Sequence, residues 1–281
     1  MKSTKYFHLI QRPGSSPKTA TSSRMKRAGK LLFSLAFSYL AIAGHAQGQP
    51  AGRQIVKQSI QWGFISSTIK LKPNYSLFVE EQLGLVECRN MQHVLRAGLE
   101  YAVTKKLSVM PFAYAYTWNY LYGKQPASFV NNERTLWQQV VYRQQISRAA
   151  VNHRLRFEER FIQTHSMGFN DEVVNNGFNN KQFRIRYRAF VNIPLNNKKI
   201  EPKTYYISIW DEIFMSWGKS VTFHKPDQNR VFIGPGYQFT KKLAIQGGFF
   251  YQMLIKSNGA RQENNTGLLL QANYNFDLSK K

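Results

Sequence analysis

The chain of 281 residues carries 39 Lys and Arg against 15 Asp and Glu, a formal charge of +24. Hydrophobic residues make up 43% and aromatic residues 14%, which argues against intrinsic disorder and favours strands over helices. The charge points to nucleic acid or an anionic membrane as a partner, and the single cysteine, Cys88, excludes an internal disulfide.

The N-terminus has the pattern of an export signal. From Met25 onward, Lys26, Arg27 and Lys30 precede an apolar segment at 31–43, and small residues lead up to Ala46. This pattern predicts a secretory signal peptide over residues 1–46, cut after Ala46 and exported through the Sec pathway. Met25 is a second candidate for the true start, with the residues before it as an extended n-region. Residues 47–281 then form one domain, with a charge of +16 and no apolar run of 18 residues that would predict a transmembrane helix.

Most of the mature chain alternates between polar and apolar residues, a pattern typical of strands. The alternation predicts eleven strands, most of them 12–15 residues long. They are, in chain order, about 59–71, 74–86, 92–103, 107–121, 134–147, 150–163, 182–195, 204–217, 228–239, 243–256 and 265–277. Strands of globular proteins average about 5–6 residues, whereas outer-membrane strands need roughly 9–11 residues to cross the hydrocarbon. The lengths therefore favour an all-β, antiparallel up-and-down transmembrane β-barrel over a soluble β-sandwich.

The predicted connections alternate between tight turns and longer polar segments, as they do in outer-membrane barrels. The longer segments are 122–133, 164–181, 218–227 and 257–264. If both chain ends lie on the periplasmic side, eleven strands are one too few, and a further strand is expected within 51–58. Single-chain bacterial barrels have even strand numbers, so twelve strands are favoured and ten are the alternative.

Two consecutive strands concentrate arginine on one face. In the stretch NHRLRFEERF (152–161) and in 183–195, the arginines occupy one parity and large apolar residues the other. An arginine facing lipid at mid-bilayer costs roughly 2–4 kcal/mol, so these charges are expected to face the lumen. With Glu212 as the favoured acidic partner, the predicted lumen charge cluster is Arg154, Arg156, Glu158, Arg160, Arg184, Arg186, Arg188 and Glu212. Asp211 and Glu80 are further candidate acids.

This cluster allows two interpretations. It could be an interior ion-pair network that fills and stiffens a small lumen, or it could line a narrow, anion-biased pore, since rings of arginine select anions. Barrels of eight strands are just filled by side chains, whereas 16–18 strands leave an open channel. A barrel of intermediate size leaves both interpretations open.

Several segments resemble a known family. They include ERTLWQQVVYRQQISRAAVNHRLRFEERF (133–161), FRIRYRAFVNIPL (183–195) and QNRVFIGPGYQFTKKLAIQGGFFYQ (228–252). Together with WGFISSTIKLKPNYSLFVEEQLGL (62–85) and YYISIWDEIFMSWG (205–218), they are similar to an uncharacterised outer-membrane β-barrel family of Bacteroidetes, domain of unknown function 2490. The resemblance covers essentially the whole mature chain and implies fold and location. It implies no activity and no site.

The alternative function is a lipid-modifying enzyme of the outer membrane, a lipid A or phospholipid hydrolase, for which His165, Ser166 and Asp171 could supply a base, a nucleophile and an orienting acid. The sequence contains no Gly-x-Ser-x-Gly, no His-Glu-x-x-His and no phosphate-binding loop, so no catalytic residue, metal or cofactor is assigned. The expected partners are outer-membrane lipids, lipopolysaccharide and the barrel assembly machinery, and no nucleic acid. The sequence leaves the oligomeric state open.

Overall fold

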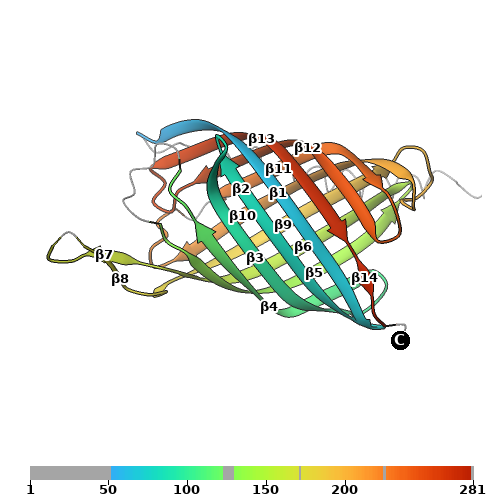
Figure 1. Cartoon of the computed structure of the whole chain (residues 1–281), viewed down its shortest axis with the longest axis horizontal. Helices are drawn as coiled ribbons and strands as arrows, with labels where there is room; N and C mark the ends of the chain where they lie inside the picture. Colours follow the sequence, from blue (N-terminus) through green and yellow to red (C-terminus); the bar gives the residue numbers. More distant parts are fainter. Residues whose placement is uncertain (1–51, 123–129, 171, 224–225, 280–281) are drawn as a thin grey trace, which may run out of the picture. The chain divides into compact units, whose positions relative to one another are not determined.

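The computed structural model describes residues 52–122, 130–170, 172–223 and 226–279. The predicted signal peptide, residues 1–46, lies outside these ranges. Every regular element within them is a β-strand, as Figure 1 shows. Within the same ranges, no helix is long and apolar enough to cross a membrane.

Eleven long strands form the wall, and each pairs antiparallel with the next along the chain. They are β1 (Gln54–Lys72), β2 (Tyr75–Val86), β3 (Arg89–Ala102), β4 (Leu107–Asn119), β5 (Glu133–Ile146), β6 (Ala149–Ile162), β9 (Asn180–Pro194), β10 (Thr204–Gly218), β11 (Gln228–Gln238), β12 (Leu243–Ile255) and β13 (Arg261–Tyr274). A separate small hairpin, β7 (His165–Met167) with β8 (Val173–Asn175), rises from the connection between β6 and β9. The predicted antiparallel barrel is confirmed.

The barrel closes where β1 meets β13, and this pair is parallel, from Gln54 opposite Arg261 to Ser66 opposite Asn273. The main sheet has the favoured twelve strands within the described ranges, but its twelfth is the short β14 (Phe276–Asp277), which pairs with the end of β1. The strand expected within 51–58 is wrong, because residues 54–58 are the start of β1. Because the number of long strands is odd, the first and the last run in the same direction. β1 and β13 therefore pair parallel, and this pairing closes the sheet without another strand.

The connections sort to the two ends of the barrel. One end, called the short-turn end, holds the connections 73–74, 103–106, 147–148, 195–203 and 239–242. The other, called the long-loop end, holds the longer segments and the β7–β8 hairpin, which projects from it at the left of Figure 1. A tight turn at Glu87 and Cys88, both with positive φ, is the exception at that end.

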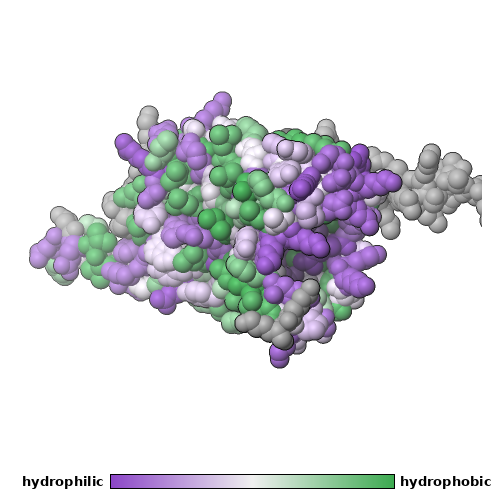
Figure 2. All heavy atoms as spheres, turned by 45° about the vertical axis from the view of Figure 1, so that its right-hand side comes forward, coloured by the Kyte–Doolittle hydropathy of each residue, from purple (hydrophilic) through white to green (hydrophobic). Residues whose placement is uncertain are grey.

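The two faces of the wall differ in character. Because the sheet closes on itself, most of the buried side chains are those that point inward. Large inward side chains, among them Trp62, Trp210, Phe232 and Phe250, are at most 3% exposed, so packed residues fill much of the interior. Outward residues such as Phe112 and Leu268 are more than 60% exposed. In Figure 2, hydrophobic residues cover much of the visible wall, while hydrophilic residues gather toward the short-turn end.

Candidate functional site

Two neighbouring strands carry the predicted arginines into the interior, and their register sets like charges opposite each other. Across β6 and β9, Arg156 lies opposite Arg186 and Arg154 opposite Arg188. Like charges placed directly opposite across a sheet repel. The arrangement therefore depends on acids inserted between the arginines.

Glu158 and Glu212 are those acids. Arg186 bridges them, with Nη1 2.8 Å from Glu158 Oε1 and Nη2 2.9 Å from Glu212 Oε1. Arg184 pairs with the second oxygen of Glu158, and Arg154 pairs with Glu212. With Arg156 added, these residues form a connected set that we call the arginine–glutamate layer: Arg154, Arg156, Glu158, Arg184, Arg186 and Glu212.

Arg156 is held mainly by neutral groups. Its Nη1 lies 3.7 Å from Glu158 Oε1, while its Nε and Nη2 donate to Gln139 Oε1 at 3.0 and 2.8 Å. The guanidinium lies over the Trp137 ring, 3.8 Å from its centroid, within the range of a cation–π contact. The side chain is 1% exposed, so the layer is packed rather than hydrated at this point.

The remaining predicted site residues lie outside this layer. Arg160 forms a two-pronged pair with Glu133, at 2.8 and 2.6 Å. Glu133 is absent from the predicted cluster because it stands one residue before the strand expected at 134–147. Arg188 lies over the rings of Phe190 and Trp210, and none of the carboxylates in the described ranges pairs with it.

The two further candidate acids face opposite ways. Glu80 points inward and pairs with Arg96 at 2.8 Å. Asp211 has the outward parity of β10, between the inward Trp210 and Glu212, and it accepts a hydrogen bond from the Asn229 amide on the outer face. The suggestion that Asp211 compensates the lumen arginines is therefore wrong.

A second inward arginine without a carboxylate partner, Arg230 on β11, was not anticipated. It is 8% exposed and takes part in none of the ion pairs found among the described residues. When the side-chain amide of Gln228 is oriented with its oxygen toward Arg230, that oxygen lies 2.9 Å from Arg230 Nε and accepts its hydrogen bond. The guanidinium also lies over the rings of Trp62 and Phe214, about 5 Å from each centroid. Neutral groups thus hold a guanidinium that forms no ion pair with a carboxylate of the described residues.

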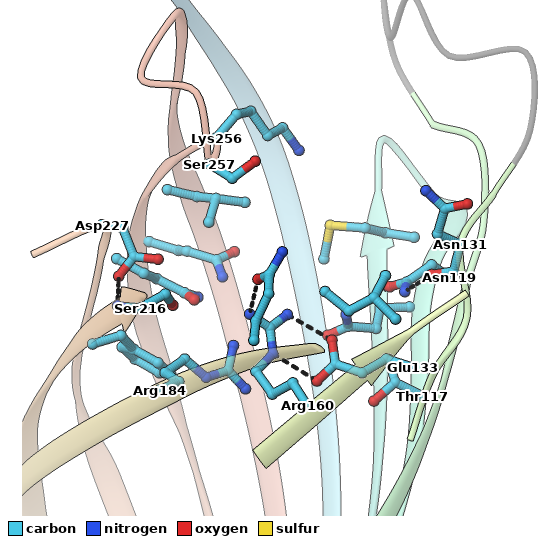
Figure 3. A pocket seen from close by; sticks show the side chains of 18 of the residues that line it. Thr117, Asn119, Asn131, Glu133, Arg160, Arg184, Ser216, Asp227, Lys256 and Ser257 are labelled. Carbon is cyan, nitrogen blue, oxygen red and sulfur yellow. Dashed lines mark hydrogen bonds and ion pairs between the residues drawn. The ribbon is translucent and has the colours of Figure 1, made fainter. Parts of the chain in front are cut away.

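Above the layer, the long-loop end contains a cavity of about 400 Å³, which we call the vestibule. Figure 3 shows Arg160 and Glu133 joined on one side of it, with Arg184, Ser216 and Asp227 on the other. Its cationic lining residues are Arg96, Arg160, Arg184, Arg186, Arg230 and Lys256. Its acidic lining residues are Glu133 and Asp227. Positive groups dominate this lining.

Buried side chains lie at the floor of the vestibule. Phe214, which lines the cavity, is 1% exposed, and Arg156 and Trp137 below are equally buried. Packed side chains therefore border the vestibule on this side and narrow the lumen there.

The residues considered for an enzyme do not come together. His165 and Ser166 are adjacent on β7, and strand geometry sends their side chains to opposite faces. His165 contacts Asn131, and Ser166 donates to Asn176. Asp171 lies outside the described residues. Within the described ranges, no three His, Cys, Asp or Glu side chains are placed to hold a metal ion.

Comparison with known proteins gives one family and one fold neighbour. A solved porin, "NanC porin structure in rhombohedral crystal form", superposes with a TM-score of 0.40 at 8% identity, over 71% of this chain and 85% of that one. No curated protein matches. The family model "Protein of unknown function (DUF2490)" matches residues 61–264, which is most of the barrel wall. The chain therefore belongs to the DUF2490 family.

Proposed function

We propose that the protein is an integral outer-membrane β-barrel of a Gram-negative bacterium, whose vestibule binds small anions and whose packed layer makes any passage narrow and anion-biased. The outer wall supports the membrane placement. Phe112, Leu268 and Leu270 are 61–65% exposed on it, and exposed apolar surface of this kind marks a membrane or protein interface. Eleven long strands of 11–19 residues are long enough to cross the hydrocarbon.

The observation that carries the anion preference is the charge of the vestibule. Six cationic side chains line it against two acids. Five of the six pair with carboxylates, and Arg230 pairs with none among the described residues. A buried charge is stable only when it is paired or well hydrogen-bonded. An anion entering from the long-loop end would supply the missing compensation and would meet a guanidinium already oriented by its glutamine and aromatic neighbours.

The arginine–glutamate layer is expected to stiffen the wall and to limit conductance. Ion pairs between neighbouring strands tie β6, β9 and β10 together from inside, which stiffens the wall and narrows the lumen. An ion can cross only if side chains of the layer move aside. A small conductance follows, well below that of an open 16–18-stranded porin.

Planar-bilayer recording in a KCl gradient tests the proposal. The wild-type protein is expected to give small currents, and the sign of their reversal potential is expected to show that anions permeate in preference to cations. Arg230→Gln is expected to move that potential toward zero. Arg143→Gln is the matched control, because Arg143 is an exposed arginine paired with Glu100 away from the vestibule. Cation selectivity, an absence of current, or equal behaviour of the two variants would contradict the proposal.

The rims suggest the lipid partners. Lys198, Lys199, Lys241 and Lys242 lie in connections at the short-turn end, where they could contact anionic phospholipid head groups. We further propose that the long-loop end contacts lipopolysaccharide and that the barrel assembly machinery inserts the protein.

A further inference from the structure

Outward aromatic residues form two belts on the barrel wall, one near each end. The belt near the short-turn end, which we call the short-turn belt, consists of Tyr75, Tyr101, Tyr205, Tyr237 and Tyr274. The belt near the other end, which we call the long-loop belt, consists of Tyr116, Trp118, Phe161, Phe183 and Trp217. Neighbouring rings lie close together in both belts, with centroids 4.5 Å apart for Tyr205 and Tyr237 and also for Tyr116 and Trp118.

The separation of the two belts matches the thickness of a membrane. Tyr205 and Trp217 are twelve residues apart on β10, which is about 41 Å along a strand that rises about 3.4 Å per residue. Strands of outer-membrane barrels are tilted by roughly 35–45°, so the belts are about 30 Å apart along the barrel axis. Aromatic girdles of such barrels flank an apolar band about 25 Å tall. If the barrel spans the outer membrane as proposed above, the long-loop belt therefore lies at one edge of the hydrocarbon.

Two cations stand in the long-loop belt, in one row across three neighbouring strands. Arg134 on β5 lies opposite Phe161 on β6, and Phe161 lies opposite Lys181 on β9. We call Arg134, Phe161 and Lys181 the cationic row. Adjacent strands are about 4.8 Å apart, so the backbones of the two cationic residues are about 10 Å apart. Among the described residues, none of the tyrosines of the short-turn belt has a cation over its ring.

Aromatic rings hold both cations at the outer surface. The guanidinium of Arg134 lies over the Phe178 ring, 4.1 Å from its centroid, and Lys181 Nζ lies 4.9 Å from the centroid of Phe183. Lys181 pairs with Glu159 at 3.1 Å, whereas the exposed Arg134 takes part in no ion pair within the described residues. A guanidinium stacked by its face keeps the N–H groups of its edge for a ligand. The row thus presents two cations against one carboxylate.

The edge of a membrane supplies anions at this height. Lipid phosphates lie just outside the hydrocarbon, where basic side chains attract them. Outer-membrane barrels turn their long loops to the cell exterior, and the exterior leaflet of that membrane consists largely of lipopolysaccharide, whose lipid anchor carries phosphate. Arginine binds phosphate through two parallel hydrogen bonds, and lysine binds it as a point charge. The chemistry of the row therefore fits the phosphate of this glycolipid.

We propose, on the basis of the membrane placement above, that the cationic row binds the phosphate of a lipopolysaccharide lipid anchor, with Arg134 and Lys181 on either side of it. Nearer the middle of the wall, Leu155 and Phe157 follow on the outward parity of β6, and Leu155 is 48% exposed. These side chains offer an apolar surface to the acyl chains of the same lipid. The proposal names the residues through which the long-loop end contacts lipopolysaccharide.

Native mass spectrometry of the mature protein in detergent, titrated with diphosphorylated lipid A, measures the affinity. The double variant Arg134→Gln with Lys181→Gln is expected to raise the apparent Kd about tenfold or more, because it removes charge-assisted hydrogen bonds. The double variant Lys105→Gln with Lys106→Gln is the matched control, because it removes the same charge from a connection at the short-turn end. A wild type that does not bind, an unchanged Kd in the first variant, or an equal loss in both would overturn the proposal.

Two further lipids identify the group that the row recognises. Lipid A stripped of its phosphates is expected to bind the wild type and the Arg134, Lys181 variant with the same weak affinity. Phosphatidylglycerol is expected to bind these two proteins equally as well, because its contacts lie elsewhere on the rims. Tight binding of the dephosphorylated lipid, or a loss of phosphatidylglycerol affinity as large as that of lipid A affinity, would overturn the assignment to the glycolipid phosphate.

Heat-modifiable gel mobility shows whether each variant is a folded barrel. The single variants Arg134→Gln and Lys181→Gln are each expected to lose part of the lipid A affinity, which keeps the test decisive if the double variant does not fold. Retention in the membrane pellet after a carbonate wash tests the membrane placement separately. A protein that stays in the membrane but does not bind lipid A through the row would overturn this proposal alone, and one that leaves the membrane would overturn the placement.

Discussion

At the scale of single residues, adjacent positions on one strand meet opposite environments. Glu158 points inward, is 2% exposed, and is contacted by Arg156, Arg184 and Arg186. Glu159 points outward and pairs with the half-exposed Lys181 at 3.1 Å. Alternation along a strand is enough to produce this difference. The two glutamates therefore offer a matched comparison of a buried ion pair and a partly exposed one.

Glu158→Gln is expected to lower the free energy of unfolding by about 3–5 kcal/mol, because it leaves buried arginines without their counter-charge. Glu159→Gln is expected to cost less than about 1 kcal/mol, as exposed pairs do. Urea unfolding in lipid vesicles, followed by tryptophan fluorescence, measures both values. Similar losses for the two variants would show that the layer does not stabilise the barrel.

At the scale of elements, the sequence located the wall strands well but not their ends. The segment predicted as 182–195 is observed as Asn180–Pro194, whereas 59–71 is observed as Gln54–Lys72. The early part of β1 carries polar residues on both faces, such as Lys57 and Gln58. Its alternation signal fades there, and only pairing with β13 extends the strand.

The parallel seam between β1 and β13 contains a close approach that depends on glycine. A Cβ added at Gly267 would fall about 1.7 Å from the carbonyl oxygen of Ile60, whereas a Cβ at Gly63 meets nothing within 4 Å. Gly267→Ala is expected to cost about 1–3 kcal/mol as the seam shifts, and Gly63→Ala less than about 0.5 kcal/mol. The same unfolding assay measures both. A neutral Gly267→Ala would indicate that this seam is not tightly closed in the membrane.

At the scale of the whole molecule, the two ends of the barrel are chemically distinct. The vestibule opens at the long-loop end, whereas two pairs of consecutive lysines, Lys198–Lys199 and Lys241–Lys242, lie in connections at the short-turn end. If the barrel spans the outer membrane and binds anions as proposed, a vestibule open to the exterior would meet external anions, whereas one facing the periplasm would meet internal ones. The orientation of the barrel in the membrane therefore decides what the vestibule can meet.

The single cysteine provides a test of this orientation. Cys88 is exposed in the tight turn between β2 and β3, at the long-loop end. If that end faces the cell exterior, a membrane-impermeant maleimide is expected to label Cys88 in intact cells. A Cys88→Ser, Lys241→Cys variant, with its cysteine at the short-turn end, is expected to react only after the outer membrane is permeabilised. The reverse labelling would place the vestibule on the periplasmic side.

The sequence by itself determined the strand class, the approximate strand positions and the face that most residues take, because a period of two is a local property of the chain. It could not determine how charges pair, since partners depend on the register between strands far apart in sequence. The Arg186 bridge between Glu158 and Glu212, the Arg160–Glu133 pair and the contacts of Arg230 with neutral neighbours all depend on that register. Closure was decided only in three dimensions as well: β1 and β13 are separated by nearly the whole wall, and their parallel pairing brings the two edges of the sheet together.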